Sequence, residues 1–138
     1  MSQKSSCVLL ADQHHGLRDS VRGLLEGEFA TVFMVANEAS LLEGAGQLKP
    51  AVVVLDLSLS AGDVRGLMGR VSERAPNAKI LMLSVHDEQT VVDAVMAAGA
   101  GAVVLKRSLA TDLMPAVDAL LAGKSYVSPG INKGKATP

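Results

Sequence analysis

Short apolar runs alternate along the chain with longer segments in which apolar residues recur at helical spacing. Five runs have the length of a β-strand and are rich in Val, Leu, Ile or Met. They are Cys7–Ala11, Thr31–Val35, Ala51–Leu57, Lys79–Val85 and Ala102–Leu105. The third run, AVVVLDL, is apolar without alternation, which is typical of a strand covered on both faces. The runs therefore predict five strands in a buried, mostly parallel sheet.

The segments between and after the runs predict five amphipathic helices. In four of them, apolar side chains three and four positions apart mark one face. These faces are formed by Leu17, Val21, Leu24 and Leu25; by Leu67, Met68 and Val71; by Val91, Val92, Val95 and Met96; and by Leu113, Val117, Leu120 and Leu121. The second helix, roughly Glu38–Ala45, is expected to be short because Gly44 and Gly46 close it. Helix-capping side chains are expected at Asn37, Asp63, Asp87 and Ser108.

Five strand-then-helix units predict an α/β fold, a doubly wound parallel sheet with helices on both faces. A chain of 138 residues has the size of one domain, which we expect to span residues 6–123 after a tail at residues 1–5. Residues 124–138, KSYVSPGINKGKATP, contain two Pro, two Gly and three Lys without an apolar period. We expect this segment to be a linker or tail.

Composition narrows the function classes. Apolar residues make up 49% of the chain, charged residues 20%, and the net charge is −1, which excludes a disordered chain and disfavours a strongly basic nucleic-acid surface. The single cysteine, Cys7, excludes an internal disulfide. The apolar core of the opening MSQKSSCVLLADQ is too short for a signal peptide or a membrane span. We therefore expect a soluble, cytoplasmic protein without a membrane partner.

Polar residues close most of the apolar runs. Asp12 and Gln13 follow the first run, Asp56 stands almost at the end of the third, and Ser84 and Lys106 close the fourth and fifth. Ligands of an open parallel sheet bind beyond the carboxyl ends of its strands, so these groups are expected to gather at one edge. Any one of them could be an ordinary surface terminus. Two carboxylates, a hydroxyl and an ammonium together are chemically complementary.

These groups fit a site that accepts a phosphoryl group. A carboxylate oxygen can attack phosphorus, and positioned cations then neutralise the charge of the transferring group. Asp56, embedded in an apolar run, is the best nucleophile candidate, and Asp12 is a candidate Mg²⁺ ligand, directly or through water. The Lys106 ammonium would contact one phosphoryl oxygen, and the Ser84 hydroxyl would donate to another.

The segments that carry these residues resemble a known family. LLADQHHGLR, VVVLDLS, LMLSVHDE and AGAGAVVLK, in this order, are similar to the receiver domains of two-component response regulators, and GKSYVSP resembles the NarL/FixJ subfamily. The resemblance covers about residues 6–128. It implies a flavodoxin-like (βα)5 fold with strand order 2-1-3-4-5. It also implies Asp56 as the phospho-acceptor, Ser84 as the switch hydroxyl and Lys106 as the phosphoryl-contacting lysine.

The resemblance further implies a cofactor and partners. The Mg²⁺ site would consist of Asp12, Gln13, Asp56 and the backbone carbonyl of Ser58. Receivers take their phosphoryl group from a histidine kinase, and they are not enzymes beyond catalysing their own phosphoryl transfer and dephosphorylation. Phosphorylation changes homodimerisation or effector output, usually in transcription regulation. DNA would be bound only through a C-terminal domain absent from this chain.

Several positions depart from the family's pattern. Gln13 stands where a second acid commonly contacts Mg²⁺, and the missing charge is expected to weaken Mg²⁺ binding about tenfold. Val103 occupies the position of the usual aromatic switch residue. In the loop after Asp56, Ser60 replaces the usual Pro and Val64 the usual Gly, so the loop backbone is expected to differ.

These departures leave two interpretations open. The first is a phosphorylatable receiver with weakened Mg²⁺ binding. The second is an atypical, phosphorylation-independent receiver that acts as a protein–protein interaction module. Flavin binding is disfavoured because no Ser/Thr-rich phosphate loop follows the first run and the chain has no Trp. His14 and His15 beside Asp12, and His86 near Ser84, are interpreted as loop residues rather than ligands or catalysts.

Overall fold

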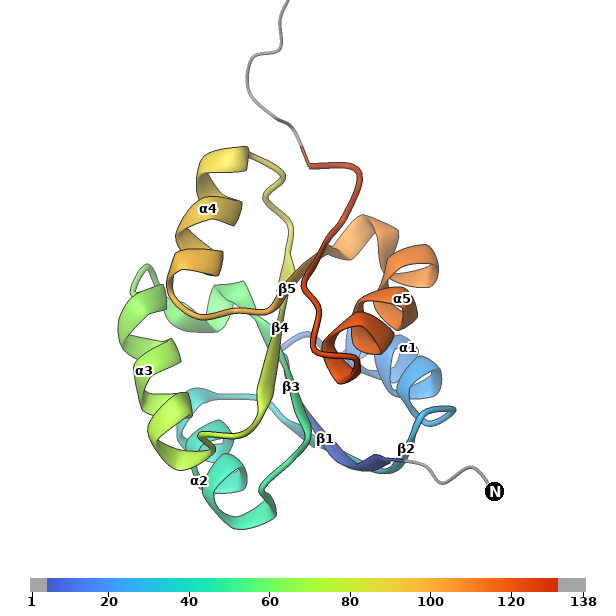
Figure 1. The fold of residues 1–138 in the computed structure, drawn as a ribbon. Coiled ribbons are helices and arrows are strands. Elements are labelled where there is room, and N and C mark those ends of the chain that lie inside the picture. Colours follow the sequence, from blue (N-terminus) through green and yellow to red (C-terminus); the bar gives the residue numbers. More distant parts are fainter. Residues whose placement is uncertain (1–4, 132–138) are drawn as a thin grey trace, which may run out of the picture.

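The computed structural model describes residues 5–131, with side chains from residue 7 onward except those of residues 15 and 16. Its parallel sheet has the order β2-β1-β3-β4-β5-β6 (Figure 1). The strands are β1 (Ser5–Ala11), β2 (Phe29–Val35), β3 (Val52–Asp56), β4 (Lys79–Ser84), β5 (Ala102–Leu105) and β6 (Tyr126–Val127). The α-helices of the described residues are α1 (His15–Leu25), α2 (Glu38–Leu48), α3 (Val64–Arg74), α4 (Gln89–Ala97) and α5 (Leu109–Leu121). Short 3-10 turns follow β3 at Leu57–Ser60 and β5 at Lys106–Ser108.

Helices cover both faces of the sheet. Helices α2, α3 and α4 pack on one face, and α1 and α5 pack on the other (Figure 1). Side chains of β3 alternate between the two layers, so that Val53 and Leu55 contact the α2–α4 layer and Val52 and Val54 contact the α1–α5 layer. Every residue of β3 is buried, which explains its unbroken apolar run. The predicted flavodoxin-like fold is confirmed, and a sixth strand extends the order 2-1-3-4-5.

Helix α2 is longer than the sequence predicts. It continues through Gly44 and Gly46 to Leu48, because the helix lies close against β1. A Cβ at Gly44 would stand 3.2 Å from a methyl carbon of Leu9, so the glycine permits the close approach rather than ending the helix. No helix in the described part of the chain is long and apolar enough to cross a membrane.

Two of the four expected capping side chains form their hydrogen bonds. Asn37 accepts from the backbone N–H of Ser40 at 2.9 Å, and Asp63 accepts from that of Gly66 at 3.0 Å. The expectation is wrong for Asp87, because Glu88 is the N-cap residue of α4. The Asp87 carboxylate pairs instead with the guanidinium of Arg107, in the 3-10 turn after β5, at 3.2 Å. Ser108 does occupy the N-cap position of α5, but its side chain makes no capping bond.

The segment after α5 differs from the expected linker. Tyr126 and Val127 pair in parallel with β5, Ser128 is buried, and Ile131 packs into the core. We call residues 124–131 the C-terminal segment. Its polar residues have partners on α5 and β5, which explains why a stretch without apolar periodicity is nevertheless attached to the sheet. The rest of the expected tails, residues 1–4 and 132–138, lies outside the described residues.

Candidate functional site

Strand register and pleat bring three of the predicted site residues together. Asp12 comes directly after the residue that pairs with Leu55 of β3, so Asp12 and Asp56 are neighbours on adjacent strands. Lys106 comes directly after the last residue of β5. Each of the three residues comes two positions after a side chain that contacts the α1–α5 layer. Because side chains two positions apart in a strand lie on the same face of the sheet, all three point to the face of α1 and α5. Those preceding side chains are Leu10, Val54 and Val104.

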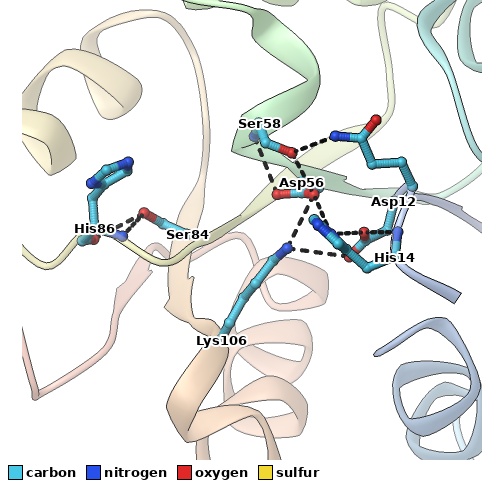
Figure 2. A network of polar contacts seen from close by, with 8 residues as sticks. Asp12, His14, Asp56, Ser58, Ser84, His86 and Lys106 are labelled. Atoms are coloured by element: carbon cyan, nitrogen blue, oxygen red, sulfur yellow. Dashed lines mark hydrogen bonds and ion pairs between the residues drawn. The ribbon is translucent and has the colours of Figure 1, made fainter. Parts of the chain in front are cut away.

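The Lys106 ammonium lies between the two carboxylates (Figure 2). Its Nζ is 3.0 Å from Asp56 Oδ2 and 3.5 Å from Asp12 Oδ2. The exposed fractions of the side chains are 0% for Asp12, 3% for Asp56 and 12% for Lys106, so water screens these charges only weakly. Two buried carboxylates and one ammonium leave a formal surplus of one negative charge, which favours an additional cation.

Ser58 completes the surroundings of Asp56. Its hydroxyl donates to Asp56 Oδ2 at 2.7 Å, and its backbone N–H donates to Oδ1 at 3.2 Å. Burial alone would raise the pKa of Asp56, but the hydrogen bonds from Ser58 and Lys106 and the charge of Lys106 outweigh it. The pKa of the Asp56 carboxyl therefore lies below its usual range, and the group is ionised at neutral pH.

His14 contacts both carboxylates of the site, although its place in the sequence favoured a loop residue without a role as ligand. Its Nδ1 lies 3.0 Å from Asp12 Oδ1 and 3.5 Å from Asp56 Oδ2 (Figure 2). The cause is an Asx-turn, because the backbone N–H of His14 donates to Asp12 Oδ1 at 2.8 Å and the loop folds back over the strand end. An aspartate two residues before a histidine, at a strand terminus, is the signal that could have indicated this placement.

Gln13 and the Ser58 carbonyl are both predicted to contact Mg²⁺, and the structure links Gln13 to Asp56 through the Ser58 hydroxyl. The side chain of Gln13 is exposed, and its amide nitrogen donates to the Ser58 hydroxyl at 3.4 Å. The Ser58 carbonyl accepts a hydrogen bond from the backbone N–H of Ala61 at 3.3 Å and keeps a second lone pair for another partner. Their role as ligands stays a prediction.

Ser84 does not join the other three groups. Its hydroxyl donates to the backbone carbonyl of His86 at 2.9 Å and accepts from the backbone N–H of His86 at 2.8 Å. Figure 2 shows these two residues together, apart from Asp56 and Lys106. The pleat explains the separation, because Met82, two positions before Ser84, contacts the α2–α4 layer. The expected convergence of four groups is therefore a convergence of three in this conformation.

A cleft of about 670 Å³ opens beside Asp56. Asp56, His14, Lys106 and His86 are the charged or titratable residues of its lining. The loop after β3 and helix α4 contribute mainly apolar residues, together with a few hydroxyls. The nearly buried Asp56 carboxylate thus borders space that a small group can enter.

The loop after β3 has positive φ angles at Ala61 (50°) and Gly62 (85°). Val64, which stands where the family usually has Gly, is the first residue of helix α3.

The donor set at this edge fits a divalent cation. One ligand atom each from Asp12, His14 and Asp56 lies within 4.8 Å of the others. In addition, Asp12 Oδ2 is buried and has no hydrogen-bond partner among the described residues. Carboxylates in a buried position with an unused lone pair are the kind of ligand that Mg²⁺ and related ions take.

An open parallel sheet with two aspartates and a lysine at its carboxyl edge defines a receiver-like protein. The chain belongs to the response regulator receiver domain family, whose model matches residues 8–118. The resemblance seen in the sequence motifs is thereby confirmed.

Relatives and a solved structure agree with this assignment. The chain is 27% identical over 126 residues to the transcriptional regulatory protein DegU of Brevibacillus brevis, which covers 90% of this chain and 53% of the relative. It is 29% identical over 124 residues to the oxygen regulatory protein NreC of Staphylococcus epidermidis, covering 87% of this chain and 56% of the relative. A LuxR-family two-component response regulator from Aurantimonas sp. matches with a TM-score of 0.83 at 27% identity, covering 93% of each chain. The chain thus spans a little over half the length of these curated relatives.

Proposed function

We propose that this receiver accepts a phosphoryl group on Asp56 from a histidine kinase and thereby changes dimerisation or effector output in transcription regulation. The observation that carries the proposal is the position of Asp56 Oδ2, which lies 3.0 Å from the Lys106 ammonium at the border of a cleft. An ionised carboxylate beside a cation and an entry path is what phosphoryl acceptance needs.

The reaction follows from these groups. A carboxylate oxygen of Asp56 attacks the phosphorus of a phosphohistidine, an O–P bond forms, and the N–P bond breaks with its electron pair returning to the imidazole. The Lys106 ammonium is placed to neutralise charge on the transferring group and on the acyl phosphate that results. The lowered pKa of Asp56 keeps the nucleophile in its charged form at neutral pH.

A divalent cation, Mg²⁺ in the family, would be held by Asp12 and Asp56, with Gln13 and the Ser58 carbonyl as the further predicted contacts. When bound, it supplies positive charge that offsets the charge of the phosphoryl oxygens. Ser84 would have to change its hydrogen bonds to take part. For its hydroxyl to donate to a phosphoryl oxygen, it must leave its two hydrogen bonds with His86 and rotate toward Asp56.

A second function is favoured by two observations. Val103, at the aromatic switch position, is 1% exposed in the core, and Ser84 is held by the backbone of His86. A receiver without a mobile aromatic side chain lacks one way of transmitting phosphorylation to its surface. This supports the alternative of a phosphorylation-independent interaction module, which predicts that Asp56→Ala retains partner binding.

Exposure to acetyl phosphate and Mg²⁺, followed by intact-mass measurement, tests the primary proposal. The wild-type protein should gain the mass of one phosphoryl group, and Asp56→Asn should gain none. Asp63→Asn is the matched control, because Asn preserves the cap at this exposed position and the adduct should persist. No adduct on the wild type, or an undiminished adduct on Asp56→Asn, would contradict phosphorylation at Asp56.

The chain spans little more than half the length of its relatives, and we propose that DNA binding resides in a further C-terminal domain. We also propose that the protein works in the cytoplasm, as response regulators usually do. Comparing the sedimentation of phosphorylated and unphosphorylated protein tests the proposed change in dimerisation.

A further inference from the structure

We propose that Arg107 couples the loop after β4 to the C-terminal segment, so that movement of this loop loosens the attachment of residues 124–131 to the sheet. The β4–α4 loop consists of residues 85–88, between Ser84 and the first residue of α4. This coupling rests on the proposed function in one respect, since phosphorylation of Asp56 is what would move the loop. It gives the site a route to the C-terminal segment.

The C-terminal segment covers the edge of β5. Tyr126 and Val127 pair in parallel with that strand. Tyr126 packs against the α1–α5 layer, whereas Ile131 packs into the α2–α4 layer, so the segment crosses from one helix layer to the other. Figure 1 shows it running between α4 and α5. The segment therefore lies beside the strand whose carboxyl end carries Lys106.

Arg107 connects this segment to the β4–α4 loop. Its Nη2 donates to Asp87 Oδ2 in the loop and to the Gly130 carbonyl in the segment, each at 3.2 Å. A Cβ at Gly130 would stand 3.3 Å from the same nitrogen, so the glycine permits the close approach. Arg107 also follows Lys106 directly in the chain. One guanidinium nitrogen thus links two elements that are distant in sequence, next to the phosphoryl-contacting lysine.

The bridge is exposed and therefore easy to open. The exposed fractions of the side chains are 56% for Arg107 and 35% for Asp87, so water and salt screen their attraction. The contact between Arg107 and the Gly130 carbonyl is likewise exposed to solvent. A contact of small net stability can be broken by a modest change at either end, which is what a regulatory link needs.

Ser84 holds the other end of the β4–α4 loop. Its hydroxyl donates to the His86 carbonyl at 2.9 Å and accepts from the His86 N–H at 2.8 Å. Both hydrogen bonds are lost when this hydroxyl turns toward a phosphoryl group on Asp56, and the backbone of His86 then needs other partners. Asp87 is the next residue and is expected to move with it. The Arg107 guanidinium then loses one of its two acceptors, and its hold on Gly130 weakens.

This route does not depend on a mobile aromatic side chain. Val103, which stands at the aromatic switch position, is 1% exposed and packs in the core. Arg107 lies beyond the end of the same strand and reaches both the loop and the C-terminal segment at the surface. A polar bridge on the surface can therefore transmit the state of the site where the core side chain cannot.

Hydrogen–deuterium exchange of peptides spanning residues 84–88 and 124–131 tests the coupling, first without a phosphoryl donor. Arg107→Met should speed exchange of residues 124–131 by about twofold to fivefold, because an exposed charged contact stabilises only slightly. Ser84→Ala, which frees the His86 backbone, should speed exchange in both peptides. Arg65→Met, at an exposed position of α3, is the matched control and should equal wild type. Exchange in β1 should stay at the wild-type level in every variant.

The second step adds acetyl phosphate and Mg²⁺, with the phosphorylated fraction read from the intact mass of the same samples. In wild type, phosphorylation should speed exchange of residues 124–131 by about twofold or more. Asp87→Ala should take up the phosphoryl group as wild type does, but without this further rise, because the loop no longer holds Arg107. Asp118→Ala, at an exposed position of α5, is the control and should respond as wild type does.

Three results would overturn the coupling. The first is wild-type exchange of residues 124–131 in Arg107→Met or Ser84→Ala. The second is an equal rise in β1, which would mean a general loss of stability. The third is an equal response of wild type and Asp87→Ala to phosphorylation. Absence of any phosphoryl adduct would contradict the proposed function alone, because Arg107→Met and Ser84→Ala decide the coupling in the unphosphorylated protein.

Discussion

Buried aspartates occur in two polar clusters, one with Asp12 and Asp56 and one around Asp112, and their carboxylates have different kinds of partner. Asp112 on α5 accepts from the Ser128 hydroxyl at 2.8 Å with one oxygen and from the Tyr126 and Thr111 hydroxyls, at 3.2 and 3.3 Å, with the other. Ser128 in turn accepts from the backbone N–H of Leu105 at 3.0 Å. Both oxygens of Asp112 therefore have donors from the protein itself.

The Asp12–Asp56 cluster is incomplete by the same measure. Asp12 and Asp56 share a single ammonium, that of Lys106, and Asp12 Oδ2 lacks a hydrogen-bond donor among the described residues. Neutral hydroxyl groups donate to Asp112, which is not part of the cleft lining, whereas Asp56 borders the cleft. The difference teaches that burial of an aspartate does not by itself mark a functional site. A buried carboxylate that lacks hydrogen-bond donors and lies next to a cleft is the better indication of such a site.

Lys106→Met should produce the largest loss of stability. It leaves two nearly buried carboxylates without their shared cation, and breaking such a pair typically lowers the free energy of unfolding by about 3 kcal/mol. Urea titration at neutral pH measures the loss, and Lys124→Met, at an exposed position, is the control. A divalent ion should restore part of the lost stability. Equal stabilities for the two variants would mean that the carboxylates do not depend on Lys106.

Asp112→Ala should have the next largest effect. Removing the carboxylate leaves the hydroxyls of Ser128 and Tyr126 without their acceptor, which should lower the free energy of unfolding by about 2 kcal/mol. Asp118→Ala, at an exposed position of the same helix, should change it little. Combining Asp112→Ala with Ser128→Ala should give less than the sum of the single effects, because both remove one hydrogen bond. Strict additivity would show that the two side chains act independently.

The pH dependence contributed by Asp56 should be the smallest effect. Its pKa is lower in the folded protein than its ordinary value of 3.8, so the unfolded chain takes up this proton at higher pH than the folded one. The stabilisation is therefore complete above the unfolded pKa and is lost as the pH falls through it toward the folded pKa. Thermal unfolding from pH 6 to pH 3 should show a shallower decline for Asp56→Asn than for wild type. A steeper fall of the melting temperature in the variant than in wild type would show that the folded state does not lower the pKa of Asp56.

Much of the fold could be predicted because its signals are local. The unbroken run of β3 and the helical spacing of α3 to α5 follow directly from burial. Asp12, Asp56 and Lys106 each follow or close an apolar run, and their predicted proximity is confirmed by the two contacts of Lys106. Their common face depends on register and pleat, and the same pleat turns Ser84 the other way, which the position of a residue at a strand end does not reveal.

The remaining differences have long-range causes. The contact of His14 depends on a loop folding back over Asp12, and the length of α2 depends on the fit of Gly44 against Leu9. The C-terminal segment has no apolar period, and its attachment depends on Asp112, at least a dozen positions away in the sequence. Pairs of this kind are visible only when the chain is folded.

The attachment of Ser128 to both Asp112 and Leu105 has a consequence for any shortened form of this protein. A fragment cut after Gly123, where α5 has ended, would expose the whole side of β5 and strip a buried carboxylate of its donors. We expect such a fragment to be less stable and more prone to self-association through the bared strand than one extending to Ile131. The self-sufficient folding unit would thus extend to Ile131, eight residues beyond a boundary drawn at Gly123.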